Sequence, residues 1–249
     1  MKIVSAIVPA YNEEKSIRFV LEQLKNARLI NEIICVNDGS LDNTISEIKK
    51  VKGIKVVDLK KNRGKSYAIV EGIRTAKGDI VLFVDADLDG KIAEAADELV
   101  TPLINGTYDV TVGYPLANSF DKFFRPLSGE RAYYKHDLEK ILDKLEKKGY
   151  GMELFLNFAF KDKRIDCFPL NGLVHKMKHE KQDYSTVVKL TVIEVLDIFS
   201  EVFSQKNPPS FFLRSYVYSF YLKQPNSKDS KIERMIKEIK EALINQFRL

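Results

Sequence analysis

Strand-like apolar segments alternate with helix-like stretches over the first third of the chain. Segments 3–8, 32–36, 54–59 and 80–84 are short, rich in apolar residues and followed by polar clusters, as buried strands are. Between them, apolar residues recur at the spacing of a helix face; they are Ile17, Val20, Leu21 and Leu24, then Ile45, Ile48 and Val51, then Ala68, Ile69 and Ile73. This alternation predicts an α/β fold with a doubly wound, mostly parallel sheet flanked by helices.

The segment 80–84 leads directly into two carboxylates, Asp85 and Asp87. Its five consecutive apolar residues favour a central strand covered on both faces. The two carboxylates lie close together whether the strand continues or bends, and like charges that close need a cation or must give up a proton. The alternative is an ordinary turn in which Asp87 caps the helix expected near residue 92.

The second half of the chain has a looser pattern. The expected elements are a helix over 93–103, a strand over 108–113, an aromatic and basic acceptor-side loop over 114–125, a helix from 153 to 160 and a strand over 164–168. Because the tail carries only helical stripes, we expect one domain over 1–182 and a helical C-terminal extension over 183–249. The extension is expected to pack on that domain, to form a homodimer or to lie on a membrane surface.

Charge and cysteine content narrow the partners and the compartment. The net charge of +5 is spread over 40 basic and 35 acidic side chains, so nucleic acid is not expected as a partner. Cys35 and Cys167 lie in apolar strand patterns without a CxxC pair, which favours buried thiols in a reducing cytoplasm. We recognise no export signal and no window approaching the roughly 18 apolar residues of a membrane-spanning helix. A cytoplasmic location is therefore expected, with peripheral attachment to the cytoplasmic membrane face left open.

The turns after the strands lack two common nucleotide-binding motifs. The first turn, 9–14, contains no glycine, so the GxGxxG pattern of a dinucleotide fold is missing. Gly64-Lys65-Ser66 matches the end of a P-loop, but Leu59 stands where that motif needs its first glycine. The polar residues that remain at the carboxyl ends of the strands are Asp38, Lys65, Asp85 and Asp87. Such a set suits a nucleobase, a diphosphate and a divalent metal, and the alternative is a group of unrelated surface turns.

Four segments in order resemble the nucleotide-sugar motifs of family 2 glycosyltransferases with the Rossmann-like GT-A fold. They are residues 6–14 (AIVPAYNEE), 36–42 (VNDGSLD), 62–66 (NRGKS) and 84–87 (VDAD). The resemblance implies that Asp38 faces the nucleobase, that Lys65 faces the phosphates and that Asp87 is a catalytic ligand of Mg²⁺ or Mn²⁺. The nucleotide-sugar-binding residues that it implies are Pro9, Ala10, Tyr11, Glu13, Asp38, Gly39, Ser40, Lys65, Asp85 and Ala86.

The second half resembles two groups within this family. Residues 126–133 (PLSGERAY) are similar to the SGxRA pattern of polyprenyl-phosphate sugar synthases and to the PLxGE pattern of glucosyl-3-phosphoglycerate synthases. The residues implied on the acceptor and sugar side are Ser128, Gly129, Glu130 and Arg131. Residues 149–153 resemble a GYGxE segment of the second group, which implies a catalytic Glu153 that binds donor-sugar hydroxyls or accepts a proton. The alternative for Glu153 is an acid that interacts with the dipole at a helix N-terminus.

Two of the three histidines fall close together, at His175 and His179. The resemblance to both groups implies that His175 is a metal ligand together with Asp87. A histidine with a purely structural role is the alternative.

Departures from both groups leave the acceptor open. Between Gly113 and Pro126 the chain has no counterpart of the phosphate-binding segment of glucosyl-3-phosphoglycerate synthases, and residues 125–127 lack the acid of the mannose synthases. We expect a metal-dependent glycosyltransferase that moves a sugar from a UDP- or GDP-sugar to a polyprenyl phosphate or related phosphorylated acceptor. Transfer to a small soluble acid, a non-catalytic nucleotide-sugar-binding regulator and a nucleotidyltransferase are the alternatives.

Overall fold

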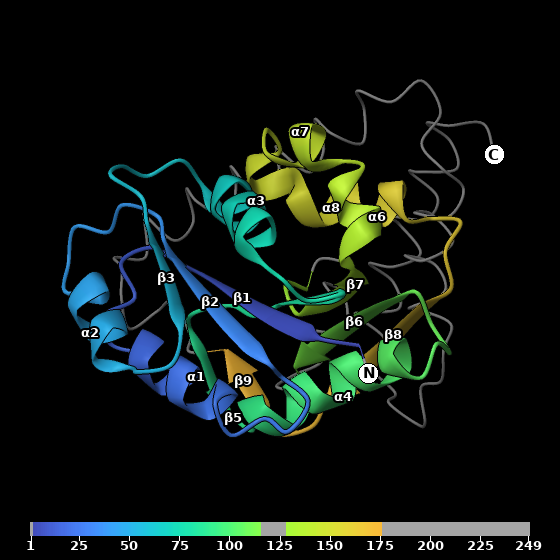
Figure 1. The fold of residues 1–249 in the computed structure, drawn as a ribbon, viewed down its shortest axis with the longest axis horizontal. Helices are drawn as coiled ribbons and strands as arrows, with labels where there is room; N and C mark the ends of the chain where they lie inside the picture. Colours follow the sequence, from blue (N-terminus) through green and yellow to red (C-terminus); the bar gives the residue numbers. More distant parts are fainter. Residues whose placement is uncertain (1, 116–127, 176–249) are drawn as a thin grey trace, which may run out of the picture.

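The computed structural model describes residues 2–115 and 128–175 of the chain, whose elements are labelled in Figure 1. The helical extension expected over 183–249, the domain boundary expected at 182 and most of the expected acceptor-side loop lie outside the described residues. Tyr114 and Pro115 do not begin that loop, because they complete strand β6 (Val110–Pro115).

A seven-stranded sheet forms the centre of the described part, in the order β3-β2-β1-β4-β7-β6-β8. Its other strands are β1 (Val4–Ala10), β2 (Glu32–Asn37), β3 (Lys55–Asp58), β4 (Ile80–Phe83), β7 (Arg131–Tyr134) and β8 (Ile165–Leu170). Strand β1 pairs in parallel with β2 and β4, and β2 pairs in parallel with β3. The parallel arrangement predicted for the first half of the chain is therefore confirmed.

Strand β7 makes the sheet mixed. It runs antiparallel to both β4 and β6, whereas β6 and β8 pair in parallel. The pattern of the sequence does not predict this strand, because the charged residues Glu130 and Arg131 interrupt the apolar run. Both charged side chains are nevertheless buried in the structure.

Helices cover both faces of the sheet (Figure 1). One face carries α1 (Ile17–Leu24), α2 (Thr44–Lys50) and α4 (Ile92–Ile104), and the other carries α3 (Lys65–Thr75), α6 (Lys135–Glu139), α7 (Leu142–Leu145) and α8 (Met152–Ala159). Successive residues of β1 point to opposite faces of the sheet. Val8 packs in a first hydrophobic core, under α1, α2 and α4, whereas Ile7 packs in a second core, under α3, α7 and α8. The second core also contains Leu156 of α8, which brings that helix against the sheet.

A small second sheet follows Asp87. Strands β5 (Leu88–Gly90) and β9 (Leu173–His175) pair antiparallel, with Leu88 opposite His175. Gly90 has a φ of 87°, and a Cβ atom there would lie 2.0 Å from the carbonyl oxygen of Gly172. Glycine is therefore needed for the close approach of the two strands.

None of the helices in residues 2–115 and 128–175 has the length and hydropathy needed to span a bilayer.

Cys35 is buried in β2 as expected, but Cys167 is exposed on β8. The expectation of two buried thiols is therefore wrong for Cys167, because β8 lies at the edge of the sheet.

Candidate active site

The polar turns singled out in the sequence gather along one edge of the main sheet. Ala10 at the end of β1 pairs with Asn37 at the end of β2, and Asn37 pairs with Asp58 of β3. The amide of Asn37 also donates from Nδ2 to Oδ1 of Asp58 at 2.7 Å. Because β4 is parallel to β1, the residues that follow Phe83 leave the sheet at the same edge.

The turns after β1 and β2 are hydrogen-bonded to each other. Asn12 donates from its backbone N to Oγ of Ser40 at 3.0 Å and accepts at Oδ1 from the backbone N of Leu41 at 2.8 Å. The backbone N of Glu13 donates to Oγ1 of Thr44 at 2.7 Å. These bonds bring together the predicted donor-site residues Tyr11, Glu13 and Ser40, and Pro9 and Ala10 are the last two residues of β1 that lead into the first turn. Of these, Tyr11 is 41% exposed and open to a ligand.

Asp38 holds the turn that precedes α3. Its carboxylate accepts hydrogen bonds from the backbone N atoms of Arg63 and Gly64, both at 2.8 Å. Burial raises the pKa of Asp38, although these two amides and the charge of Arg63 oppose the rise. Gly39 has a φ of 66°, and a Cβ atom there would lie 2.4 Å from the backbone carbon of Lys61. Asp38 and Gly39 therefore position the start of α3, and the nucleobase contact of Asp38 stays a prediction.

Lys65 joins three segments that are far apart in the sequence. Its Nζ atom lies 2.8 Å from Oδ1 of Asp85 and 3.2 Å from Oε1 of Glu153. The side chains of Lys65, Asp85 and Glu153 are 32%, 21% and 12% exposed. We call these three residues the Lys65 cluster. The structure thus brings together three residues that were predicted separately: Lys65 as phosphate-facing, Asp85 as nucleotide-sugar-binding and Glu153 as catalytic.

Neighbouring carboxylates keep the amine of Lys65 protonated. Burial alone would lower the pKa of its ammonium, but the carboxylates of Asp85, Glu153 and Glu130 together raise that pKa well above its usual value. The site therefore offers a permanent positive charge next to acids that a second cation or a ligand can engage.

Gly129 lies directly against the Lys65 cluster. A Cβ atom on Gly129 would lie 2.6 Å from Oδ2 of Asp85 and 2.9 Å from Nζ of Lys65. Next to it, Ser128 donates from Oγ to Oε2 of Glu130 at 2.7 Å. The segment predicted on the acceptor and sugar side therefore lines the cluster, and a side chain on Gly129 would displace the end of the Asp85 or Lys65 side chain.

Arg131, the last of the predicted acceptor-side residues, points into the protein. It is 1% exposed, and its Nη1 donates to Oδ1 of Asn157 on α8 at 2.7 Å. Asn157 is not among the residues predicted from the sequence. Its position four residues after Glu153 on an otherwise apolar helix was the available signal, because that spacing places both residues on one face.

Pairing in the small sheet brings the backbone of His175 next to the residue that follows Asp87. The backbone of His175 pairs with Leu88, the residue next to Asp87, while Ala86 is buried between the two acids. Among the side chains that the structure describes, no three His, Cys, Asp or Glu residues form a metal-binding group. Carboxylate and imidazole are both ligand types for divalent cations, and the metal site at Asp87 and His175 stays a prediction.

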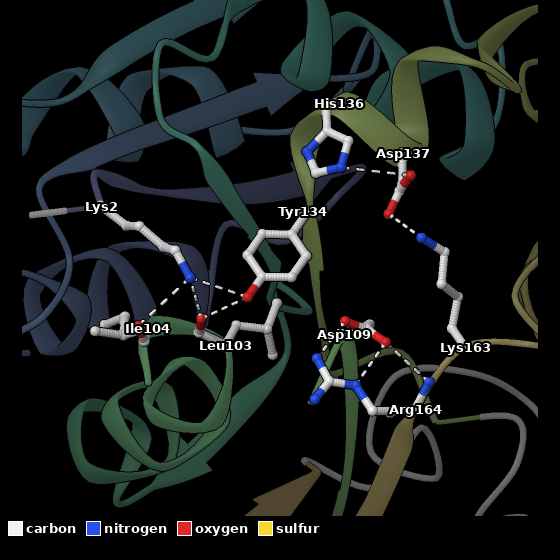
Figure 2. A network of polar contacts seen from close by, with 9 residues as sticks. All are labelled: Lys2, Leu103, Ile104, Asp109, Tyr134, His136, Asp137, Lys163 and Arg164. Atoms are coloured by element: carbon white, nitrogen blue, oxygen red, sulfur yellow. Dashed lines mark hydrogen bonds and ion pairs between the residues drawn. The ribbon is translucent and has the colours of Figure 1, made fainter. Parts of the chain in front are cut away.

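A wide concavity of about 860 Å³ lies at the opposite edge of the sheet and contains none of the predicted site residues. Lys2 at its wall donates to the carbonyl oxygen of Leu103 at 2.7 Å and to the hydroxyl of Tyr134 at 3.0 Å (Figure 2). The three groups fasten the start of the chain to α4 and β7. The candidate active site therefore lies at the Lys65 cluster, beside the carboxyl ends of the parallel strands, and not in this concavity.

Comparison with known proteins identifies relatives by sequence. A family model described as Glycosyl transferase family 2 matches residues 5–162. An undecaprenyl-phosphate 4-deoxy-4-formamido-L-arabinose transferase of Aeromonas hydrophila is 34% identical over 163 residues, covering 62% of this chain and 46% of the relative. A dolichol-phosphate mannosyltransferase of Pyrococcus furiosus is 29% identical over 202 residues, covering 75% and 55%. The chain thus spans about half the length of these curated relatives.

Solved structures share the fold at lower identity. Glucosyl-3-phosphoglycerate synthase from Mycobacterium tuberculosis, in complex with Mn²⁺, UDP and glucosyl-3-phosphoglycerate, is 21% identical with a TM-score of 0.63. The match covers 80% of this chain and 79% of that one. The same enzyme in complex with Mg²⁺ and UDP gives a TM-score of 0.64 at 21% identity.

Proposed function

Because this chain belongs to glycosyl transferase family 2, we propose that it transfers a sugar from a nucleoside diphosphate sugar to the phosphate of a polyprenyl lipid. The chain is a glycosyltransferase with the GT-A fold. The proposal of a nucleoside diphosphate sugar as donor rests on the Lys65 cluster, in which one ammonium lies between Asp85 and Glu153. A cation held at the carboxyl edge beside a carboxylate suits a diphosphate on one side and a sugar on the other.

The donor would lie along the turns of the parallel strands. The exposed Tyr11 and the paired turn at Ser40 would contact the nucleobase and ribose, and Asp85 would contact the ribose. Lys65 would exchange part of its contact with Asp85 for the phosphate oxygens, since a diphosphate carries more negative charge than one carboxylate. The ammonium then stabilises charge on the leaving diphosphate.

Asp87 and His175 would hold Mg²⁺ or Mn²⁺ against the diphosphate. The solved structures with this fold contain either ion together with UDP. When bound, the ion supplies further neutralisation of the leaving group. We assign the ion to Asp87 because Asp87 directly precedes β5, and β5 pairs with the strand that ends at His175.

The role of Glu153 depends on the acceptor. A phosphate monoester has a second pKa of about 6, so a lipid phosphate is already an anion at neutral pH and needs no base to remove a proton. A hydroxyl acceptor does need one. For a polyprenyl phosphate, Glu153 therefore orients the hydroxyl groups of the donor sugar, and Lys65 holds its carboxylate in place for that task.

The relatives favour the lipid acceptor. Two of them are named as transferases that act on undecaprenyl phosphate and dolichol phosphate. Such substrates would place this chain at the cytoplasmic face of a membrane. A second candidate is transfer to a small soluble acid, since the same fold occurs in an enzyme solved with phosphoglyceric acid.

A matrix of donors and acceptors tests the proposal. The full chain with Mn²⁺ would be assayed with UDP- and GDP-sugars against undecaprenyl phosphate, dolichol phosphate and 3-phosphoglycerate. We expect a sugar-linked lipid phosphate as the product. Transfer to 3-phosphoglycerate alone would select the second candidate, and nucleotide-sugar binding without transfer to any acceptor would favour a regulatory protein.

A further inference from the structure

Arg131 is a charged residue in the middle of the sheet. It lies on β7, opposite Phe83 of β4 and Val112 of β6, and is 1% exposed. An arginine in such a position costs free energy unless its donors are satisfied, and an apolar side chain would fill the space at lower cost. Its retention inside the fold therefore needs a reason beyond packing.

The guanidinium of Arg131 connects the loop before β7 to helix α8. Its Nε donates to the carbonyl oxygen of Ser128 at 2.5 Å. Its Nη1 donates to Oδ1 of Asn157 at 2.7 Å and lies 3.5 Å from the carbonyl oxygen of Glu153. Glu153 and Asn157 are four residues apart and lie on one face of α8, so a single planar group contacts two successive turns of the helix.

Both ends of this connection reach the Lys65 cluster. Ser128 precedes Gly129, which lies against Lys65 and Asp85. Glu153, on the other side, places its carboxylate 3.2 Å from Nζ of Lys65. Arg131 therefore sets the separation between the Ser128–Gly129 segment and the helix that supplies Glu153.

We propose that Arg131 is a positioning residue that holds α8 through Asn157, so that the Glu153 carboxylate stays in reach of Lys65 and of the donor sugar. The inference rests on the proposed function for the role of Glu153 toward the sugar. The geometric part, the dependence of the Lys65–Glu153 contact on Arg131, stands on the distances alone.

Lysine cannot replace arginine in this role. An ammonium is a single point of charge, whereas the guanidinium presents separate donors to Ser128 and Asn157 at the same time. Arg131→Lys keeps the charge and most of the volume but should lose the connection. Asn157→Asp keeps an acceptor for Arg131, whereas Asn157→Ala removes it.

A double-mutant cycle tests the geometric part without any substrate. Urea unfolding would give the free energy of unfolding of three variants: Lys65→Met, Glu153→Gln and the double variant. The same set would be measured in the otherwise wild-type chain and again in the Arg131→Lys background. We expect a measurable coupling between Lys65 and Glu153 in the wild type, its loss in Arg131→Lys, and its retention with Arg164→Lys, an exposed arginine remote from the site. Coupling of equal size in both backgrounds would overturn the proposal, as would the absence of coupling in the wild type.

Asn157 provides a second route if Arg131→Lys does not fold. Asn157→Ala should lose the same coupling, and Asn157→Asp should restore it. Coupling that survives Asn157→Ala would equally overturn the proposal.

An activity assay separates this inference from the proposed function. With UDP-glucose and Mn²⁺, or with GDP-mannose if that is the donor used, Arg131→Lys should lower kcat for transfer at least tenfold and change the KM for the donor little. An unchanged kcat in Arg131→Lys, when Glu153→Gln is inactive, would overturn the positioning role. Full activity in Glu153→Gln would instead contradict the proposed role of Glu153, whatever the coupling shows.

Discussion

The ammonium of Lys65 lies 3.2 Å from the carboxylate of Glu153, a residue 88 positions later in the chain. Lys65 stands at the first position of α3 and Glu153 in the first turn of α8. The two helix starts are also joined where Ser66 donates from Oγ to the carbonyl oxygen of Gly149 at 3.2 Å. The Lys65 cluster lies between two helix starts and depends on their relative position, so substitutions that leave each helix intact can still disturb it.

Lys65→Met should weaken donor binding. The substitution removes the cation proposed to face the diphosphate and also removes the contacts of Lys65 with Asp85 and Glu153. We expect transfer to fall about 100- to 1,000-fold, as for the loss of one group that stabilises developing charge. Thermal unfolding with UDP or GDP plus Mn²⁺ checks the binding step, because a ligand at about 100 times its Kd adds about 2.7 kcal/mol. Lys61→Met, an exposed lysine in the preceding turn, is the matched control, and an equal loss in both variants would argue against a specific role for Lys65.

Gly129→Ala should reduce activity more than stability explains. The added Cβ atom would lie 2.6 Å from Oδ2 of Asp85, so the carboxylate or the loop must shift. A misplacement of about 1 Å at a reacting site can lower the rate about 100-fold. Gly53→Ala is a useful comparison, because Gly53 has open space around it and a φ of 83° and should lose only stability. Transfer rates and urea midpoints of both variants decide the matter, and normal transfer by Gly129→Ala would show that the cluster tolerates rearrangement.

His175→Ala should weaken metal binding. The backbone of His175 pairs with the residue after Asp87, and both residues are predicted as ligands of one ion. Calorimetric titration of Mn²⁺ in the presence of UDP should give at least about a tenfold weaker Kd for the variant. His179→Ala serves as the matched control from the same segment. An unchanged Kd would return His175 to a structural role.

The pair of Asp109 and Arg164 should make stability depend on acid pH. Hydrogen bonds from Arg164 lower the pKa of Asp109 from 3.8 to about 2 (Figure 2). Because the pKa is lower in the folded state, the pair stabilises the fold above pH 3.8, and this contribution is lost as the pH falls towards 2. Urea midpoints measured between these values should fall less steeply for Asp109→Asn than for the wild type. Parallel curves for the two proteins would show that the pair contributes nothing at equilibrium.

The sequence predicts those parts of the fold that depend on local pattern. The first four strands, their helices and the acids after Phe83 follow from periodicity and turn composition, and the structure has the parallel sheet that they imply. Each of these signals lies within one segment, so no knowledge of distant partners is needed.

The remaining features depend on contacts between distant segments. Strand β7 is not predicted because an arginine is buried there only when Ser128 and Asn157 supply its acceptors. The small sheet is not predicted either, because β5 and β9 are each three residues long and lie far apart in the sequence. The contacts of Lys65 are tertiary in the same sense, and no local pattern predicts which carboxylates it meets.

Metal-dependent transfer of a sugar to a lipid phosphate is decided by comparing Asp87→Ala with the wild type. The assay would measure sugar transferred to undecaprenyl phosphate with Mn²⁺ present and after chelation. We expect product only for the wild type with metal, while Asp87→Ala unfolds with the same urea midpoint yet forms none. Equal product from Asp87→Ala, or undiminished product after chelation, would show that transfer does not depend on a metal held by Asp87.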